Sequence, residues 1–169
     1  MPDTTLLQGK KVLVVDDEPD VLDVLEEILD MCEVTRASTF EEAREHLEKE
    51  MFDLAILDIM GVDGYKLLNI AKRRNITAVM LTANALSPDN LVKSMKGGAD
   101  SYIPKEEMGR ITTFLVDILK SQGQGESPWE AWRRQVTSSY FDKKWGRDWK
   151  SHNKEFWEKF NSGNLDKSS

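Results

Sequence analysis

The sequence predicts a doubly wound α/β protein, in which helices cover both faces of a five-stranded parallel sheet, followed by a short C-terminal helical appendage. Over about the first 120 residues, short apolar runs alternate with stretches in which apolar residues recur at helical spacing. All five tryptophans lie beyond residue 120, after a polar, glycine-rich stretch. We therefore expect a domain at 9–121, a linker at 122–128 and a helical appendage at 129–162.

Five short runs have the apolar character of buried parallel strands. They lie at 11–15, 33–36, 53–58, 78–81 and 101–103. Five stretches with apolar residues three and four positions apart predict helices. They lie at 19–29, 39–47, 65–74, 88–96 and 111–119. Thr39 and Glu42 form a capping box at the start of the second helix. Right-handed crossovers between these strands place helices on both faces of the sheet.

Charged and hydroxyl side chains collect where the predicted strands end. They are Asp16, Asp17, Glu18, Asp58, Thr82 and Lys105. The carboxyl ends of parallel strands meet at one edge of a sheet, where ligands bind. Carboxylates gathered there repel one another unless a cation lies among them, and oxygen ligands suit Mg²⁺. With a hydroxyl and an ammonium as donors to an anion, this set describes a phosphoryl-transfer site with a carboxylate nucleophile. The acidic pair after the first strand can also cap the following helix.

The chain resembles the receiver domain of two-component response regulators over about residues 9–120. The matching residues are Val14-Val15-Asp16-Asp17-Glu18-Pro19, Asp58, Asp63-Gly64, Thr82-Ala83, Gly97-Gly98-Ala99-Asp100, Tyr102 and Lys105. The resemblance implies a flavodoxin-like fold with strand order 2-1-3-4-5.

The resemblance also implies a role for each residue at the strand ends. Asp58 would accept a phosphoryl group from a histidine kinase or a phosphotransfer protein. Asp17 and Asp58 would bind Mg²⁺ directly, Asp16 through water, and the backbone carbonyl of Met60 would complete the ligands. Lys105 would pair with a phosphate oxygen. The protein would then assist only its own phosphorylation and dephosphorylation, and would not be an enzyme with an external substrate.

Thr82 and Tyr102 would form the switch. The resemblance implies that the Thr82 hydroxyl moves toward the phosphoryl oxygens and that Tyr102 turns into the vacated space. The surface of the fourth helix, fifth strand and fifth helix would change with them and contact a downstream protein. The alternative for Tyr102 is a half-buried sheet residue whose hydroxyl contacts water. The small Ala83 would leave room for a phosphodonor.

Two departures from the family pattern concern the site. The loop from Asp58 to Asp63-Gly64 is about two residues shorter than usual and has no proline, so it closes more tightly over the metal. Pro104 precedes Lys105, and the residue after the lysine is Glu106, so we expect no cis peptide there. The short loop favours an alternative function, a phosphate-independent interaction module.

Composition limits the partners. The net charge is −7, which disfavours nucleic-acid binding. A further alternative function is a transcription regulator whose appendage binds DNA. Cys32 is the only cysteine, so no internal disulfide forms. We expect a cytoplasmic protein with no membrane span. His46 and His152 have no predicted phosphotransfer role.

The appendage has its own pattern. Ser127 and Glu130 form a capping box before an apolar stripe that begins with Trp129 and Trp132. A second helix is expected from about residue 148, with Gly163 as its cap. So short a segment cannot bury its nine aromatic residues alone. They need a partner surface, which is the receiver itself, a second copy in a homodimer, or another protein.

Overall fold

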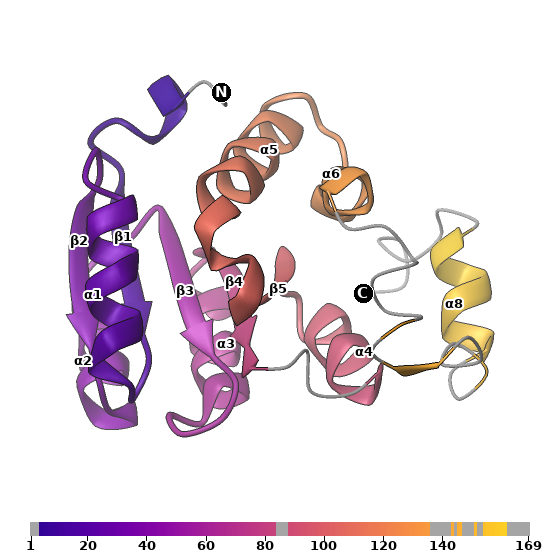
Figure 1. Ribbon diagram of the computed structural model, residues 1–169, viewed down its shortest axis with the longest axis horizontal. Coiled ribbons are helices and arrows are strands. Elements are labelled where there is room, and N and C mark those ends of the chain that lie inside the picture. The colour runs from indigo at the N-terminus through magenta and orange to yellow at the C-terminus, as the bar shows by residue number, and fades with distance from the viewer. Residues whose placement is uncertain are drawn as a thin grey trace.

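The computed structural model describes residues 4–83, 88–135, 143, 145–146, 151 and 154–161. Its five strands form one sheet in which all neighbours are parallel, in the order β2-β1-β3-β4-β5 (Figure 1). The strands are β1 (Lys11–Val15), β2 (Glu33–Ala37), β3 (Leu54–Asp58), β4 (Thr77–Thr82) and β5 (Ser101–Pro104). The predicted fold class and strand order are therefore confirmed.

Five helices alternate with these strands. They are α1 (Pro19–Ile28), α2 (Phe40–Lys49), α3 (Gly64–Arg73), α4 (Pro88–Lys96) and α5 (Ile111–Gly123). In Figure 1, α1 and α5 lie in front of the sheet and α2 and α3 behind it. This follows from right-handed crossovers, because the chain steps from β1 outward to β2 and then returns through β3 to β5. Two short 3₁₀ helices, Thr4–Leu7 and Lys105–Arg110, flank the alternation.

The core follows from the central strands, which are covered on both faces. All five residues of β3 are buried, and so are Val12 to Val15 of β1. Such strands are apolar along their whole length, which explains why the sequence shows runs there and not alternation. Leu7, in the 3₁₀ helix before the predicted domain start, is also fully buried.

Local signals in the sequence place the ends of two helices. The backbone N–H of Glu42 donates to the Thr39 hydroxyl at 3.2 Å, so Thr39 is the predicted N-cap of α2. In the appendage, the Ser127 hydroxyl accepts from the N–H of Trp129 at 3.3 Å. Ser127 therefore caps α6 (Pro128–Gln135). The N–H that its hydroxyl accepts from belongs to Trp129, and not to Glu130 as the predicted capping box requires.

The junction between the two parts is shorter than predicted. Helix α5 continues to Gly123, and α6 begins at Pro128, so only residues 124–127 connect them. A second appendage helix, α8 (Lys154–Asn161), is present where the described residues resume. Our expectations for His152 and Gly163 lie outside the described residues. No helix in the described part of the chain combines the length and the apolar character that a membrane span requires.

The appendage packs on the receiver. Trp129 and Trp132 of α6 are 4% and 6% exposed, and both belong to the cluster of buried side chains that forms the core. Helix α6 contacts α5 and β5. Trp157 of α8 is buried as well. Of the three partner surfaces considered for these aromatic residues, α6 therefore uses the receiver itself.

Candidate functional site

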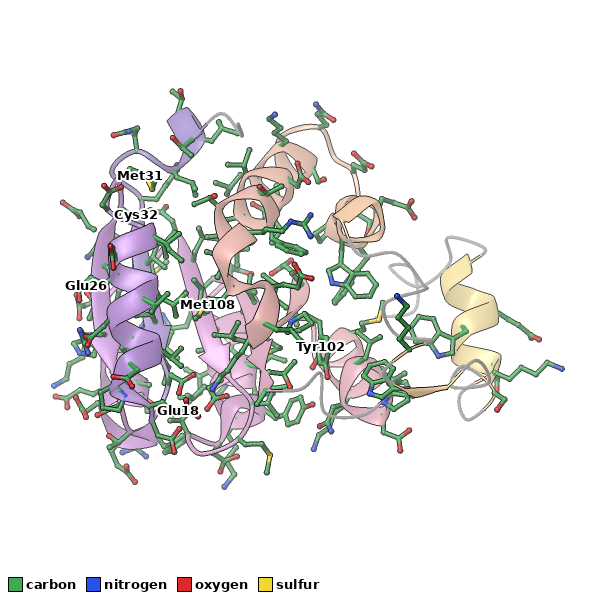
Figure 2. All side chains as sticks on the ribbon, in the orientation of Figure 1. Glu18, Glu26, Met31, Cys32, Tyr102 and Met108 are labelled. Carbon is green, nitrogen blue, oxygen red and sulfur yellow. The ribbon has the colours of Figure 1, made fainter. Side chains whose placement is uncertain are left out.

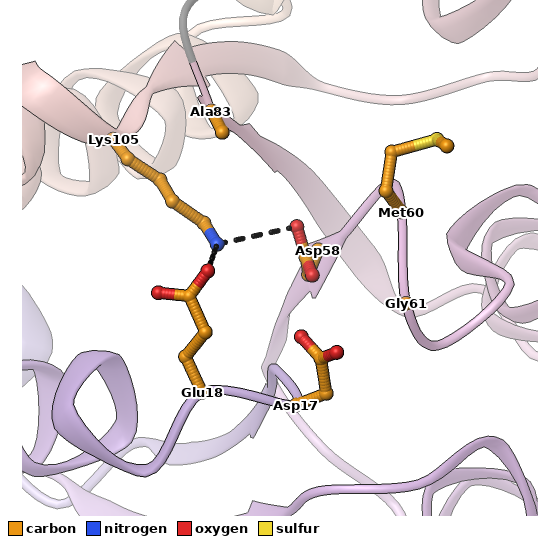
Figure 3. A pocket seen from close by; sticks show the side chains of 7 residues that line it. All are labelled: Asp17, Glu18, Asp58, Met60, Gly61, Ala83 and Lys105. Atoms are coloured by element: carbon orange, nitrogen blue, oxygen red, sulfur yellow. Dashed lines mark ion pairs between the residues drawn. The ribbon is translucent and has the colours of Figure 1, made fainter.

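A pocket of about 180 Å³ opens at the carboxyl edge of the sheet (Figure 3). Its lining residues are Asp17, Glu18, Asp58, Met60, Gly61, Ala83 and Lys105. They follow or end β1, β3, β4 and β5, and β1 and β3 are neighbours from which the chain runs to opposite faces. The pocket therefore lies at the switch point of the topology, where doubly wound sheets bind ligands.

Lys105 is the cation of the site. Its Nζ lies 2.8 Å from Asp16 Oδ2, 3.5 Å from Asp58 Oδ1 and 3.6 Å from Glu18 Oε1. Burial is the largest single effect and lowers the pKa of Lys105, but the hydrogen bond to Asp16 and the charges of Asp58, Asp16 and Glu18 together outweigh it, so the net pKa is raised. The ammonium therefore stays charged and holds two buried carboxylates together.

One ammonium does not balance the acidic groups around it. Burial, followed by the charge of Asp16, raises the pKa of Asp58 to about 7. Burial also raises the pKa of Asp16, although Lys105 and the N–H of Glu18 oppose it. The site thus has a deficit of positive charge, which a divalent cation would remove.

The residues present fit Mg²⁺. Carboxylate oxygens of Asp16, Asp17 and Glu18 lie within 4.8 Å of one another, and Asp58 faces the same pocket. The pocket has room for an ion with several water molecules, as Mg²⁺ prefers. Asp17 and Asp58 are the direct carboxylate ligands that this arrangement offers.

Asp16 orders the turn that follows β1. Its Oδ1 accepts from the N–H of Glu18 at 2.9 Å. The N-cap residue of α1 is Glu18, and it makes no side-chain capping bond. The alternative that Asp16 or Asp17 caps this helix is therefore wrong, because Glu18 occupies the N-cap position. Asp16 is fully buried.

The short loop after β3 closes on Asp17 through Gly61. This glycine has a φ of +83°, and a Cβ on it would lie 2.6 Å from Asp17 Oδ2. A Cβ on Gly64 would lie 2.1 Å from the carbonyl oxygen of Asp58, so α3 begins directly against the strand end. Both positions require glycine. The short loop predicted the tight closure, but no local pattern identifies Gly61, because only the fold brings it to Asp17.

The other predicted residues lie in different surroundings. The Met60 side chain is 64% exposed beside the pocket. Thr82 is buried, and its hydroxyl donates to the Ala83 carbonyl at 3.4 Å. Tyr102 is fully buried, so the half-buried alternative is wrong. The peptide between Lys105 and Glu106 is trans, as expected.

Two residues acquire contacts that sequence patterns did not predict. Glu18 pairs with Lys105 across the pocket, although its place after β1 had marked it only as acidic. His46 of α2, for which no phosphotransfer role was predicted, lies with its Nδ1 2.6 Å from a carboxylate oxygen of Glu50, the C-cap residue of the helix.

This fold and pocket define a doubly wound α/β protein with an acidic pocket, and one lysine among its carboxylates, at its switch point. Comparison with protein families gives the particular class: the model of the response regulator receiver domain matches residues 12–115. The chain belongs to this family.

Individual relatives agree with this assignment. Over 120 residues the chain is 34% identical to the response regulator protein PilR of Pseudomonas aeruginosa, and the match covers 68% of this chain and 27% of PilR. The phosphate regulon transcriptional regulatory protein PhoB of the same organism is 32% identical over 70% of this chain and 56% of its own length. The chain thus spans only part of these relatives. Because PhoB is named a transcriptional regulator, our expectation about nucleic acid stays a prediction.

Solved structures show the same fold. A CheY-like receiver domain from Methanospirillum hungatei is 30% identical, with a TM-score of 0.58, and the match covers 68% of this chain and 99% of that one. The response regulator DrrB of Thermotoga maritima is 26% identical with a TM-score of 0.58, over 71% of this chain and 55% of its own. The appendage lies beyond the family match.

Proposed function

We propose that this chain is a phosphorylation-controlled signalling receiver, in which Asp58 accepts a phosphoryl group from a histidine kinase or a phosphotransfer protein in a Mg²⁺-dependent reaction. The observation that carries the proposal is the position of Lys105, 2.8 Å from Asp16 and 3.5 Å from Asp58. An ammonium beside a buried carboxylate is the arrangement that an added phosphoryl group requires.

In this reaction a carboxylate oxygen of Asp58 attacks phosphorus, and the bond between phosphorus and the donor's nitrogen breaks. Lys105 pairs with a phosphoryl oxygen as charge develops there. Ala83, exposed at the pocket rim, leaves the donor room to approach. Bound Mg²⁺ would neutralise further oxygen charge and favour the ionised form of Asp58. Asp16, Asp17 and the carbonyl of Met60 are the groups that would hold it.

The product acts by changing a surface. Phosphorylation adds nearly two negative charges and three acceptor oxygens at Asp58. The Thr82 hydroxyl moves toward them and Tyr102 follows, altering the face formed by α4, β5 and α5, which we name the output face. A downstream protein binds this face. The chain acts in the cytoplasm and has no external metabolic substrate.

Intact-mass measurement tests this function. The protein is incubated with acetyl phosphate and Mg²⁺, and we expect the gain of one phosphoryl mass. The gain disappears in Asp58→Asn and in excess EDTA. Asp53→Asn is the matched control, because Asp53 precedes the same strand, at its opposite end, and its carboxylate accepts from the N–H of Lys11 at 2.9 Å. Failure of the wild type to gain mass would instead support the phosphate-independent module.

A further inference from the structure

Two indole groups of helix α6 form hydrogen bonds to the receiver. Trp129 Nε1 donates to the carbonyl of Ala99 at 3.1 Å, and Trp132 Nε1 donates to the carbonyl of Tyr102 at 2.8 Å. The two rings pack edge to face, with centroids 5.2 Å apart. One bond therefore lies just before β5 and the other within it. Because the indole N–H groups donate to two particular main-chain carbonyls, the bonds favour one position of α6 against β5.

The surface beneath α6 belongs to the output face. β5 is the edge strand of the sheet, with α4 and α5 as its neighbouring helices. Tyr102, labelled in Figure 2, lies within β5. Both tryptophan rings are almost completely buried there. A protein that binds the same part of this face has to displace α6.

The strand that α6 holds also carries the switch. Tyr102 accepts the Trp132 bond through its carbonyl, and Lys105 follows three residues later. The docked position of α6 is thus observed together with one arrangement of Lys105, in which its ammonium contacts the Asp16 and Asp58 carboxylates.

We propose that α6 is an intramolecular occupant of the output face, and that phosphorylation of Asp58 releases it. This inference rests on the function proposed above. A phosphoryl group on Asp58 draws Lys105 away from Asp16 and changes the packing of Tyr102. The carbonyl that accepts from Trp132 shifts with the strand, and the 2.8 Å hydrogen bond between them lengthens and weakens. Release exposes both the face and the tryptophans to a partner.

Limited proteolysis of the full chain measures the release. Trypsin cleaves after Arg133 and Arg134 of α6, and a docked helix resists cleavage in proportion to how seldom it opens. Acetyl phosphate with Mg²⁺ supplies the phosphoryl group, and intact mass reports the phosphorylated fraction of the same sample. We expect cleavage at these sites to be at least about threefold faster in the phosphorylated protein, and unchanged in Asp58→Asn.

The coupling is reciprocal, so loosening α6 must favour phosphorylation. Trp132→Phe keeps an aromatic ring and removes the donor to Tyr102. We expect it to raise the phosphorylated fraction at limiting acetyl phosphate by about two- to threefold. The matched control is Gln122→Ala, which removes a 2.8 Å bond from α5 to Thr77. The bond has the same length as the one from Trp132 but joins α5 to the first residue of β4, and the phosphorylated fraction should stay the same.

Each result decides the matter. Equal or slower cleavage in a sample that mass shows to be phosphorylated overturns the inference and leaves the proposed function intact. A phosphorylated fraction in Trp132→Phe equal to or below that of the wild type overturns it as well. If no phosphoryl mass appears in the wild type, the proposed function fails and this inference fails with it.

Discussion

Lys105 connects the stability of the site with its chemistry. It is 14% exposed, and it lies between the carboxylates of Asp16 and Asp58, which are 0% and 6% exposed. Groups so deeply buried are poorly solvated, so a single ammonium offsets much of the repulsion between the acids. The same ammonium is in place to meet a phosphoryl oxygen. Its position therefore serves both the resting protein and the transfer.

Lys105→Met tests this double role. The variant leaves two buried carboxylates without their cation, and we expect a loss of about 2–3 kcal/mol in the free energy of unfolding in EDTA. Phosphorylation by acetyl phosphate should also become at least about tenfold slower. Chemical denaturation and intact mass measure the two effects. Lys66→Met is the control, because Lys66 pairs with Asp63 on the surface and its side chain is 72% exposed. Equal stability of the two variants would contradict this account.

The β3–α3 loop is one of the two places where we expected a departure from the family pattern. It is short because Gly61 turns with a positive φ against Asp17 and because α3 begins at Gly64 against the end of β3. The loop therefore fixes the distance between the phosphoacceptor and the acidic turn after β1. Any other residue at position 61 would bring a Cβ against the Asp17 carboxylate, and it would also have to adopt a positive φ that disfavours side chains.

Gly61→Ala should damage the cation site more than the fold. The added Cβ would lie 2.6 Å from Asp17 Oδ2, so either the loop or the carboxylate must move. We expect the affinity for Mg²⁺ to fall by about tenfold, with a loss of roughly 1–2 kcal/mol in stability. Calorimetric titration with Mg²⁺ and thermal unfolding in EDTA measure these changes. Gly123→Ala, where a Cβ meets nothing within 4 Å, is the control. Unchanged Mg²⁺ affinity in Gly61→Ala would show that the loop does not hold Asp17 in place.

At the scale of the whole molecule, periodicity was sufficient to predict the strands and helices, whereas the strand order came from the resemblance to a family. Every predicted strand and every helix of the receiver is present, because buried parallel strands and one-sided helices leave distinct patterns. The positions of Asp58 and Lys105 followed from the rule that strand ends meet at one edge. Contacts between distant segments have no local signal. The bond from Trp132 to Tyr102, the burial of Tyr102 and the approach of Gly61 to Asp17 were therefore visible only in the structure.

The global stability of the receiver should depend on pH through Asp58. Burial and the charge of Asp16 raise its pKa to about 7, above the unfolded value of about 3.9. An acid whose pKa is higher in the folded state contributes stability that is fully present below its pKa in the unfolded state. This stability is lost as pH rises through its pKa in the folded state. In EDTA, the wild type should therefore lose stability relative to Asp58→Asn between pH 5 and pH 8, by about 2–3 kcal/mol.

Chemical denaturation of the wild type and Asp58→Asn from pH 5 to pH 8 measures the difference in their free energies of unfolding, which we call the gap. Mg²⁺ should close the gap at pH 8, since it stabilises the ionised carboxylate, and should have little effect at pH 5, where a proton competes with it. Asp30→Asn is the control, because Asp30 is exposed and precedes the opposite end of β2. A gap independent of both pH and Mg²⁺ would mean that Asp58 is ionised throughout. The acidic pocket would then have no need of a second cation, and the metal-dependent chemistry would lose its physical basis.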